Sequence, residues 1–172
     1  MSAVAWLHGD LLRPVVAPYQ SDASRRDALR LVLVVAQFHV ELAPRYQRRD
    51  VTGDGAPETF CNFFVRDVSE AMGAPVPQVR ANEQVQWLGS DAARARGWAA
   101  ISEHAAQGCA AEGLFVVAGW YNRNGGSGHV AVVMPSLDED GTFIAQAGLS
   151  NFTHGRLAQG FGPREVSFFA HP

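Results

Sequence analysis

Up to about residue 113, apolar residues recur every three or four positions, a spacing typical of helices that bury one face. This spacing predicts helices at 24–42, 61–72, 81–88 and 102–111. Ser24 can cap the first helix and Pro44 ends it, whereas Gly73 follows the end of the second. The face of the first helix that we expect to be buried carries Leu29, Val32, Leu33, Ala36 and Val40.

After Gly113 the pattern changes to continuous apolar runs rich in valine and aromatic residues, which are typical of buried strands. The expected strands cover residues 114–120, 129–134, 142–147 and 165–170. A glycine-rich turn (122–128) and an acidic turn (136–141) separate the first three strands. Residues 152–161 are expected to form a loop.

Helices followed by an antiparallel meander predict an α+β fold, in which N-terminal helices pack on a C-terminal antiparallel sheet. The length of 172 residues fits one domain. Residues 1–23, which carry Pro14 and Pro18, lack a clear period and are expected to form an extended arm beside a core of residues 24–172.

Charge and hydropathy exclude several classes of function. A net charge of −3 does not suit a general nucleic-acid binder and provides no polybasic patch for acidic lipids. The longest apolar run, 31–36, is too short to span a bilayer, and the N-terminus lacks the basic and apolar regions of a signal peptide. We therefore expect a monomer made in the cytoplasm that binds no nucleic acid and does not insert into membranes.

Two residues suggest nucleophilic chemistry. Cys61 stands at the start of the second helix, where free N–H groups and the helix dipole stabilise a thiolate, so we expect it to be partly exposed there. His129 opens a strand directly after the glycine-rich turn, and a neutral imidazole in that place could accept the thiol proton. Taken singly, Cys61 could equally be a small buried apolar residue, and His129 could face solvent.

A third polar residue could complete a triad. Gln146 lies on the strand that follows that of His129, and a hairpin between them makes the two residues neighbours on one face. Its side-chain carbonyl can accept the imidazole N–H and fix the tautomer. Asn151 is the alternative for this role. A cysteine at a helix start, then a histidine at a strand start, then a polar carbonyl is the papain-like order.

At these residues the sequence resembles the papain-like cell-wall amidohydrolases of the NlpC/P60 and CHAP families. The stretch TFCNFFVRDVSEAMG is similar to their nucleophile helix, GHVAVVMP to their histidine strand, and GTFIAQAG to the strand with the third polar residue. The resemblance implies a papain-like fold, with Cys61 as nucleophile, His129 as general base and acid, and Gln146 as the residue that orients it.

The family resemblance also implies the activity. It suggests a peptidoglycan hydrolase that cleaves an amide bond, either as a stem-peptide endopeptidase or as an N-acetylmuramoyl-L-alanine amidase, without a required cofactor. A phage lysin or a secreted antibacterial effector would fit the apparent lack of a signal peptide. The alternatives are a papain-like peptidase, deamidase or acyltransferase acting on a protein or lipid, and an inactive binding module of the same fold.

Three further features bear on the site. The loop 50–58 resembles the calcium loop of some CHAP domains, with Asp50, Thr52 and Asp54 at alternating positions, but Cys61 stands where its last acidic ligand is expected. The backbone N–H of Cys61 is expected in the oxyanion hole, and Thr59 or Asn62 could supply the second donor. Three tryptophans could line a substrate groove, although core packing is expected for at least two: Trp87, Trp98 and Trp120.

Overall fold

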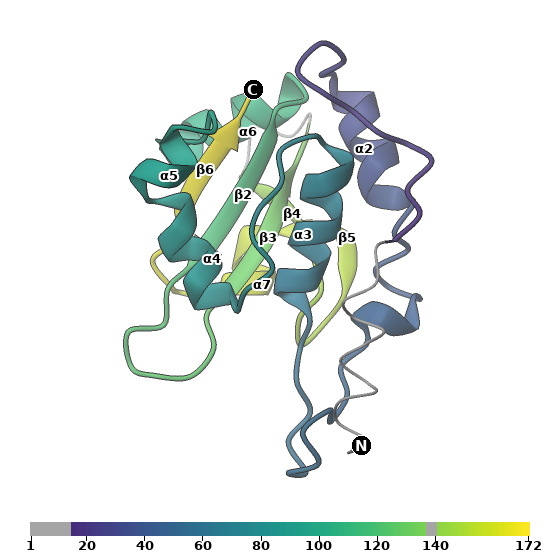
Figure 1. Ribbon diagram of the computed structural model, residues 1–172, viewed down its shortest axis with the longest axis vertical. Coiled ribbons are helices and arrows are strands. Elements are labelled where there is room, and N and C mark those ends of the chain that lie inside the picture. The colour runs from purple at the N-terminus through teal and green to yellow at the C-terminus, as the bar shows by residue number, and fades with distance from the viewer. Residues whose placement is uncertain (1–14, 137–140) are drawn as a thin grey trace.

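The computed structural model describes residues 15–136 and 141–172, and its centre is a six-stranded antiparallel sheet (Figure 1). The strand order is β1-β6-β2-β3-β4-β5. The strands are β1 (Ala99–Ile101), β2 (Phe115–Trp120), β3 (His129–Met134), β4 (Phe143–Gln146), β5 (Phe152–Arg156) and β6 (Ser167–His171). The expected combination of helices with an antiparallel sheet is therefore confirmed.

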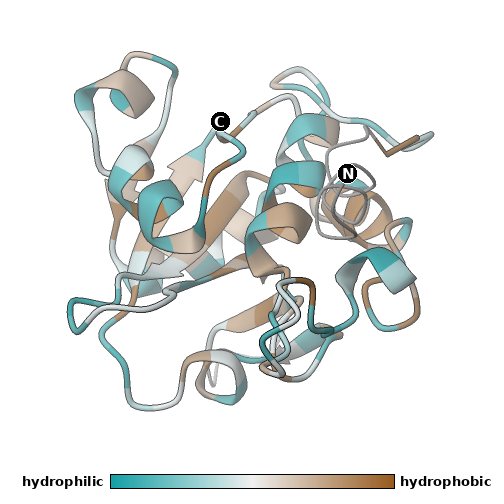
Figure 2. Cartoon of the chain, turned by 60° about the horizontal axis from the view of Figure 1, so that its bottom comes forward, coloured by the Kyte–Doolittle hydropathy of each residue, from teal (hydrophilic) through white to brown (hydrophobic). Residues whose placement is uncertain are grey.

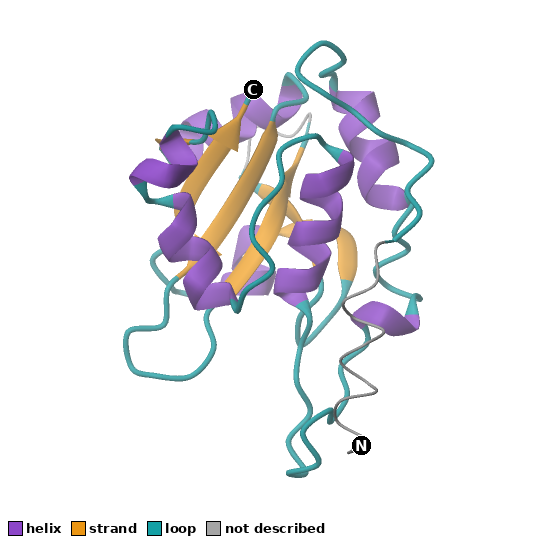
Figure 3. Cartoon of the chain, in the orientation of Figure 1, coloured by secondary structure: helices purple, strands orange, loops and turns teal. Residues whose placement is uncertain are grey.

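Helices lie on both sides of the sheet (Figure 3). They are α2 (Ala28–Ala36), α3 (Cys61–Ala71), α4 (Ala81–Leu88), α5 (Asp91–Arg94), α6 (Glu103–Ala111) and α7 (Leu157–Phe161), with a short 3₁₀ helix η1 (Pro44–Tyr46). In the view of Figure 1, α3 and α4 cross the front of the sheet, and α7 contacts β4 and β5. Within the described residues, no helix has the length and apolar character needed to cross a membrane.

The central strands are buried on both faces, which explains their continuous apolar runs. Residues 115–118 of β2 and 130–133 of β3 have no exposed surface. Figure 2 shows hydrophobic residues along these strands and hydrophilic residues on the outer helices and loops. One large core joins the sheet to α2, α3, α4 and α6, so side chains at the ends of the central strands are held on a packed scaffold.

The first helix is shorter than expected and buries a different face. Only α2 (Ala28–Ala36) is helical, and the side chain of Asp27, rather than that of Ser24, caps it by accepting the N–H of Arg30 at 2.7 Å. Its buried face carries Leu31, Val34 and Val35, whereas Leu29 of the expected face is 67% exposed. The prediction was wrong because the segment ALRLVLVVA is apolar on nearly every side, and its period cannot select one face.

The C-terminal part also differs from expectation. The expected loop 152–161 consists of β5 and α7, and β6 does not continue the meander but pairs with β2. The sequence of β5, FTHGR, lacks the alternation of a half-buried strand, because it lies at the sheet edge. Residues 137–140 of the expected acidic turn and residues 1–14 of the expected arm lie outside the described residues. The rest of the arm, residues 15–23, contains neither helix nor strand.

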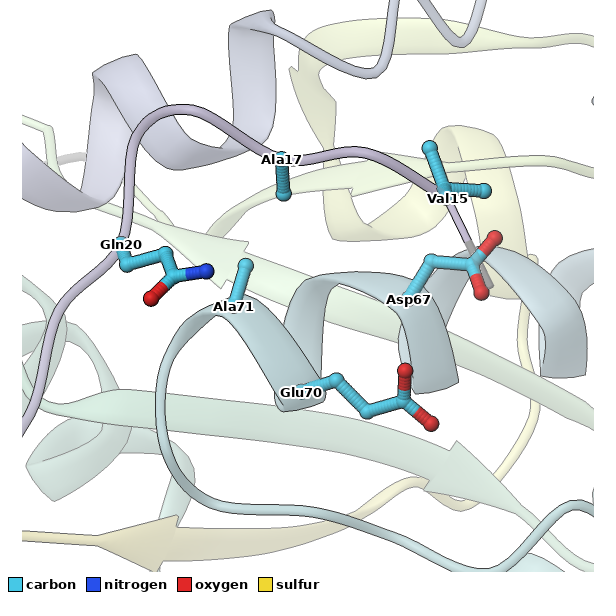
Figure 4. A pocket seen from close by; sticks show the side chains of 6 residues that line it. All are labelled: Val15, Ala17, Gln20, Asp67, Glu70 and Ala71. Carbon is cyan, nitrogen blue, oxygen red and sulfur yellow. The ribbon is translucent and has the colours of Figure 1, made fainter.

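A buried carboxylate on α3 joins this helix to the segment that precedes it. Asp67 on α3 is bonded at 2.6 Å by Nε of Arg45, at 2.8 Å by the hydroxyl of Tyr46 and at 2.8 Å by Nη2 of Arg66. Asp67 and Glu70 also line a small pocket under residues 15–20 (Figure 4). Neither Cys61 nor His129 lines this pocket, so it is separate from the site described next.

Candidate active site

Cys61 is the first residue of α3, as the sequence predicts. The helix begins there because Phe60, at φ −120° and ψ 34°, leaves the helical conformation. Cys61 is only 3% exposed, so the expectation of a partly exposed cysteine was wrong. The thiol nevertheless has polar contacts, because it lies against the side chain of His129 and the backbone N–H groups of Val130 and Asn62.

His129 and Gln146 lie on the same face of the sheet. Nε2 of His129 is 2.7 Å from Oε1 of Gln146. Because β3 pairs with β4 through Val132 and Ala145, Gln146 is a diagonal rather than a direct neighbour of His129. An amide oxygen can only accept, so Nε2 carries the proton and Nδ1 is left for Cys61. The structure thus brings together the three side chains chosen from the sequence.

The electrostatics of the pair favour charge separation. Burial alone would raise the pKa of the Cys61 thiol, but the hydrogen bond and charge of His129 and the nearby backbone N–H groups hold this pKa below its ordinary 9.0. Burial would lower the pKa of His129, but the hydrogen bond and charge of Cys61 and the contact with Gln146 hold it above 6.5. Both pKa shifts move the pair towards a thiolate beside an imidazolium.

The side chain of Gln146 is fixed from both ends. Its Nε2 donates to the carbonyl of Ser150 at 2.9 Å, which directs Oε1 towards His129. Gly160 of α7 packs so closely that a Cβ there would lie 2.3 Å from Oε1. A Cβ at Gly148 would lie 3.3 Å from Cε1 of His129. These glycines allow the backbone to hold both side chains in one orientation.

Asn151 has a different place. Its Nδ2 donates to the carbonyls of Val40 and Tyr46, both at 3.0 Å, and its Oδ1 accepts the N–H of Gly148. These bonds join the end of the β4 segment to the chain that precedes α3. Asn151 thus supports the site through the backbone, without a hydrogen bond to His129 among those of the described residues.

This difference gives a testable prediction. Gln146→Ala should lower kcat about 10- to 100-fold, less than loss of a charged third residue, because a neutral amide orients the imidazole but adds little charge stabilisation. Asn151→Ala should change kcat less than about threefold but destabilise the fold by about 2 kcal/mol, because the carbonyl of Tyr46 and the N–H of Gly148 lose this hydrogen-bond partner. Turnover assays and urea unfolding measure these effects. A larger loss of kcat in a folded Asn151→Ala variant would contradict the assignment.

In the loop that resembles a calcium loop, the carboxylates accept backbone N–H groups of the loop itself. Asp50 accepts the N–H groups of Gly53 and Gly55 at 2.6 and 2.8 Å, and Asp54 accepts that of Ala56 at 2.8 Å. Within residues 15–136 and 141–172, no three His, Cys, Asp or Glu side chains gather as metal ligands. These oxygens do not converge on one point as a ligand set, and the mechanism proposed below uses no metal ion.

Of the three tryptophans considered for a substrate groove, one lies at the site. Trp98 is 2% exposed and belongs to the core, and Trp87 packs against the core from its edge. Trp120 pairs directly with His129 across the β2–β3 ladder, so it is the tryptophan at the site. The side chain of Asn62 donates to the carbonyl of Val79 at 2.8 Å and is thereby directed away from an oxyanion hole.

Sequence reasoning missed several residues around His129. The ring of Phe161 lies 4.8 Å from the imidazole, and Arg164 lies over the ring of Trp120. Asn82 of α4 accepts the N–H of Asn122 and donates to the carbonyl of Gly126, which holds the turn before His129. The motif GFGPR offered a signal, because two glycines around a phenylalanine are typical of a close backbone approach. The prediction of a loop at 152–161 did not place this motif next to a helix, which is where the structure has it.

The chain was also compared with known proteins. No protein-family model matches it, and no curated protein is a significant match. The functional argument therefore depends on the geometry of Cys61, His129 and Gln146.

Proposed function

We propose that the protein is a cysteine amidohydrolase with a papain-like arrangement that cleaves an amide bond of peptidoglycan. The observation that carries the proposal is the contact series from Cys61 to His129 to Gln146, with a lowered thiol pKa and a raised imidazole pKa. Buried polar groups at the ends of three separate elements, α3, β3 and β4, meet here. The resemblance of the sequence to cell-wall amidohydrolases supplies the substrate.

The geometry supports the following reaction. The Cys61 thiolate attacks the amide carbonyl carbon, and the new oxyanion is stabilised by backbone N–H groups at the start of α3. The His129 imidazolium gives its proton to the leaving nitrogen as the C–N bond breaks, which leaves a thioester and a free amine. Neutral His129 then takes a proton from water as the water oxygen attacks the thioester carbon. The C–S bond breaks, which releases a carboxylic acid and restores the Cys61 thiolate beside the imidazolium. Gln146 keeps the imidazole in the reactive tautomer throughout.

A second candidate shares this chemistry. A Cys–His pair performs any acyl transfer, so a protein or lipid substrate fits the same three residues. An inactive binding module fits less well, because a cysteine and a histidine in contact, with pKa values shifted towards each other, are typical of a reactive site. The experiment must therefore distinguish a peptidoglycan substrate from a protein or lipid substrate.

The test is digestion of purified sacculi, followed by mass spectrometry of the released muropeptides. Cys61→Ala and Cys109→Ala serve as matched controls, since Cys109 is the other free cysteine and lies on α6. We expect new amine and carboxyl ends with the wild type and the Cys109 variant only. Intact sacculi combined with cleavage of an isopeptide or lipid amide by the same preparation would assign the second candidate.

The pKa shifts give a further prediction. Alkylation of Cys61 by iodoacetamide should reach its half-maximal rate at a pH below 9.0, because the thiolate persists to lower pH. Cys109 should show its midpoint above 9.0, because burial and the charge of Glu112 raise its thiol pKa. His129→Ala should move the Cys61 midpoint upwards, since only the backbone N–H groups of Val130 and Asn62 then oppose the effect of burial on the thiol pKa. Equal midpoints for Cys61 and Cys109 in the wild type would contradict the ion pair.

A further inference from the structure

An arginine that the proposed reaction does not use packs against two neighbours of the imidazole, Trp120 and Phe161. The guanidinium of Arg164 lies 4.5 Å from the centre of the Trp120 ring, and its Nη1 donates to the carbonyl of Phe161 at 2.7 Å. Trp120 is the cross-strand partner of His129, and the Phe161 ring is in contact with the imidazole. Two residues that flank His129 therefore hold Arg164 in place.

Arg164 keeps donors available for a ligand. One of its five N–H groups is used by Phe161, and among the residues that the structure describes no carboxylate forms a salt bridge with it. The side chain is exposed to solvent, but the stack on Trp120 restricts its orientation. A fixed guanidinium with free N–H groups suits a carboxylate, which it can bind in a bidentate manner.

The position of Arg164 indicates which part of a substrate it meets. His129 must protonate the leaving nitrogen, so the leaving group lies on the imidazole side of the scissile bond. Trp120 pairs with His129, the ring of Phe161 contacts the imidazole, and Arg164 packs against both of these residues, so we infer that Arg164 faces the leaving group. The charge of Arg164 reaches the imidazole, where it opposes the rise of the His129 pKa. A bound carboxylate would neutralise this charge and favour the protonated imidazole that the reaction needs.

We propose that Arg164 binds a free carboxylate on the leaving group, so that the preferred substrate is an amide whose leaving amine carries a carboxylate on its neighbouring carbon. This inference rests on the proposed amidohydrolase function and narrows it. In a wall peptide, such a bond precedes a terminal residue or a cross-linking residue with a free carboxylate. The bond between the sugar and the first stem residue lacks this group, so the proposal favours a peptidase over an amidase.

The first experiment measures alkylation of Cys61 by iodoacetate and by iodoacetamide, with peptide mapping to separate Cys61 from Cys109. The ratio of the two rates reports attraction of a carboxylate and is independent of the thiolate population, which acts equally on both reagents. We expect Arg164→Gln to lower this ratio about fivefold, because the substitution removes the positive charge that attracts the carboxylate of the reagent. The control is Arg96→Gln, because Arg96 also lies over a tryptophan, Trp87, and should leave the ratio unchanged.

The second experiment uses N-acyl dipeptides whose leaving residue ends in a carboxylate or in a carboxamide. Wild type should prefer the carboxylate at least tenfold in kcat/KM, mainly through KM, and Arg164→Gln should lose this preference. Arg164→Lys should keep only part of it, since an ammonium lacks the planar fork.

The outcomes separate the two proposals. An unchanged rate ratio and an unchanged carboxylate preference in Arg164→Gln, with a reactive Cys61, would overturn the role of Arg164 and leave the amidohydrolase proposal intact. A Cys61 that reacts no faster than Cys109 with either reagent would overturn both.

Discussion

Replacement of Cys61 by alanine should lower kcat by at least about 10⁴-fold, because the reaction then lacks its nucleophile and retains only binding and oxyanion stabilisation. The fold should survive. Cys61 is buried, but removal of one sulfur atom creates a small cavity, and we expect a loss of about 1–2 kcal/mol in the free energy of unfolding. Turnover assays and urea unfolding on the same preparation measure both quantities.

The matched control is Cys109→Ala, which removes a sulfur atom from α6, far along the chain from the triad. Its kcat should stay within about twofold of wild type, since Cys109 has a raised thiol pKa and no catalytic partner. Retention of activity in a folded Cys61→Ala variant would remove the nucleophile from the proposed mechanism.

Asp67→Ala should cause the largest loss of stability, about 3–5 kcal/mol. Asp67 is the common partner of Arg45, Arg66 and the Tyr46 hydroxyl, and its side chain is 1% exposed. Its removal takes one counter-charge from two partly or fully buried guanidinium groups, so the desolvation of those groups is compensated less well. The free energy of unfolding in urea measures the effect.

Glu70→Ala is the control for this variant, because Glu70 lies one turn further along α3 and pairs with Nε of the same Arg66 at 3.5 Å, with its side chain 50% exposed. The loss should stay below about 1 kcal/mol, as for other solvated ion pairs. Similar losses for Asp67→Ala and Glu70→Ala would show that the buried network does not anchor α3.

The elements that carry the candidate triad could be predicted because their local signals agree. Gly73, with φ +65°, ends α3 where a glycine was expected, and β3 begins at His129 as the glycine-rich turn predicts. The side chains of Cys61, His129 and Gln146 meet because a short connection makes β3 and β4 antiparallel neighbours, which fixes one register.

The remaining features depend on tertiary contacts that no local pattern encodes. Leu29 and Leu31 are equally apolar, and only packing against the core decides that Leu31 is buried. Arg164 reaches the site because β6 pairs with β2, a choice made between distant segments. The burial of Cys61 likewise arises from elements that assemble around α3. Such features required the assembled structure.

The place of β6 in the sheet has a consequence for the order of assembly during synthesis. Strands β2 to β5 pair with their neighbours in sequence, so this meander can form as it leaves the ribosome. In contrast, β1 pairs only with β6, through Ala99 and Ala170, and must wait for about 70 further residues. The nascent chain therefore holds an unpaired β1 and an open edge of β2 until residues 167–171 emerge. Until then Arg164 is not held against Trp120, so the candidate site is completed only after strands β2 to β5 have been made.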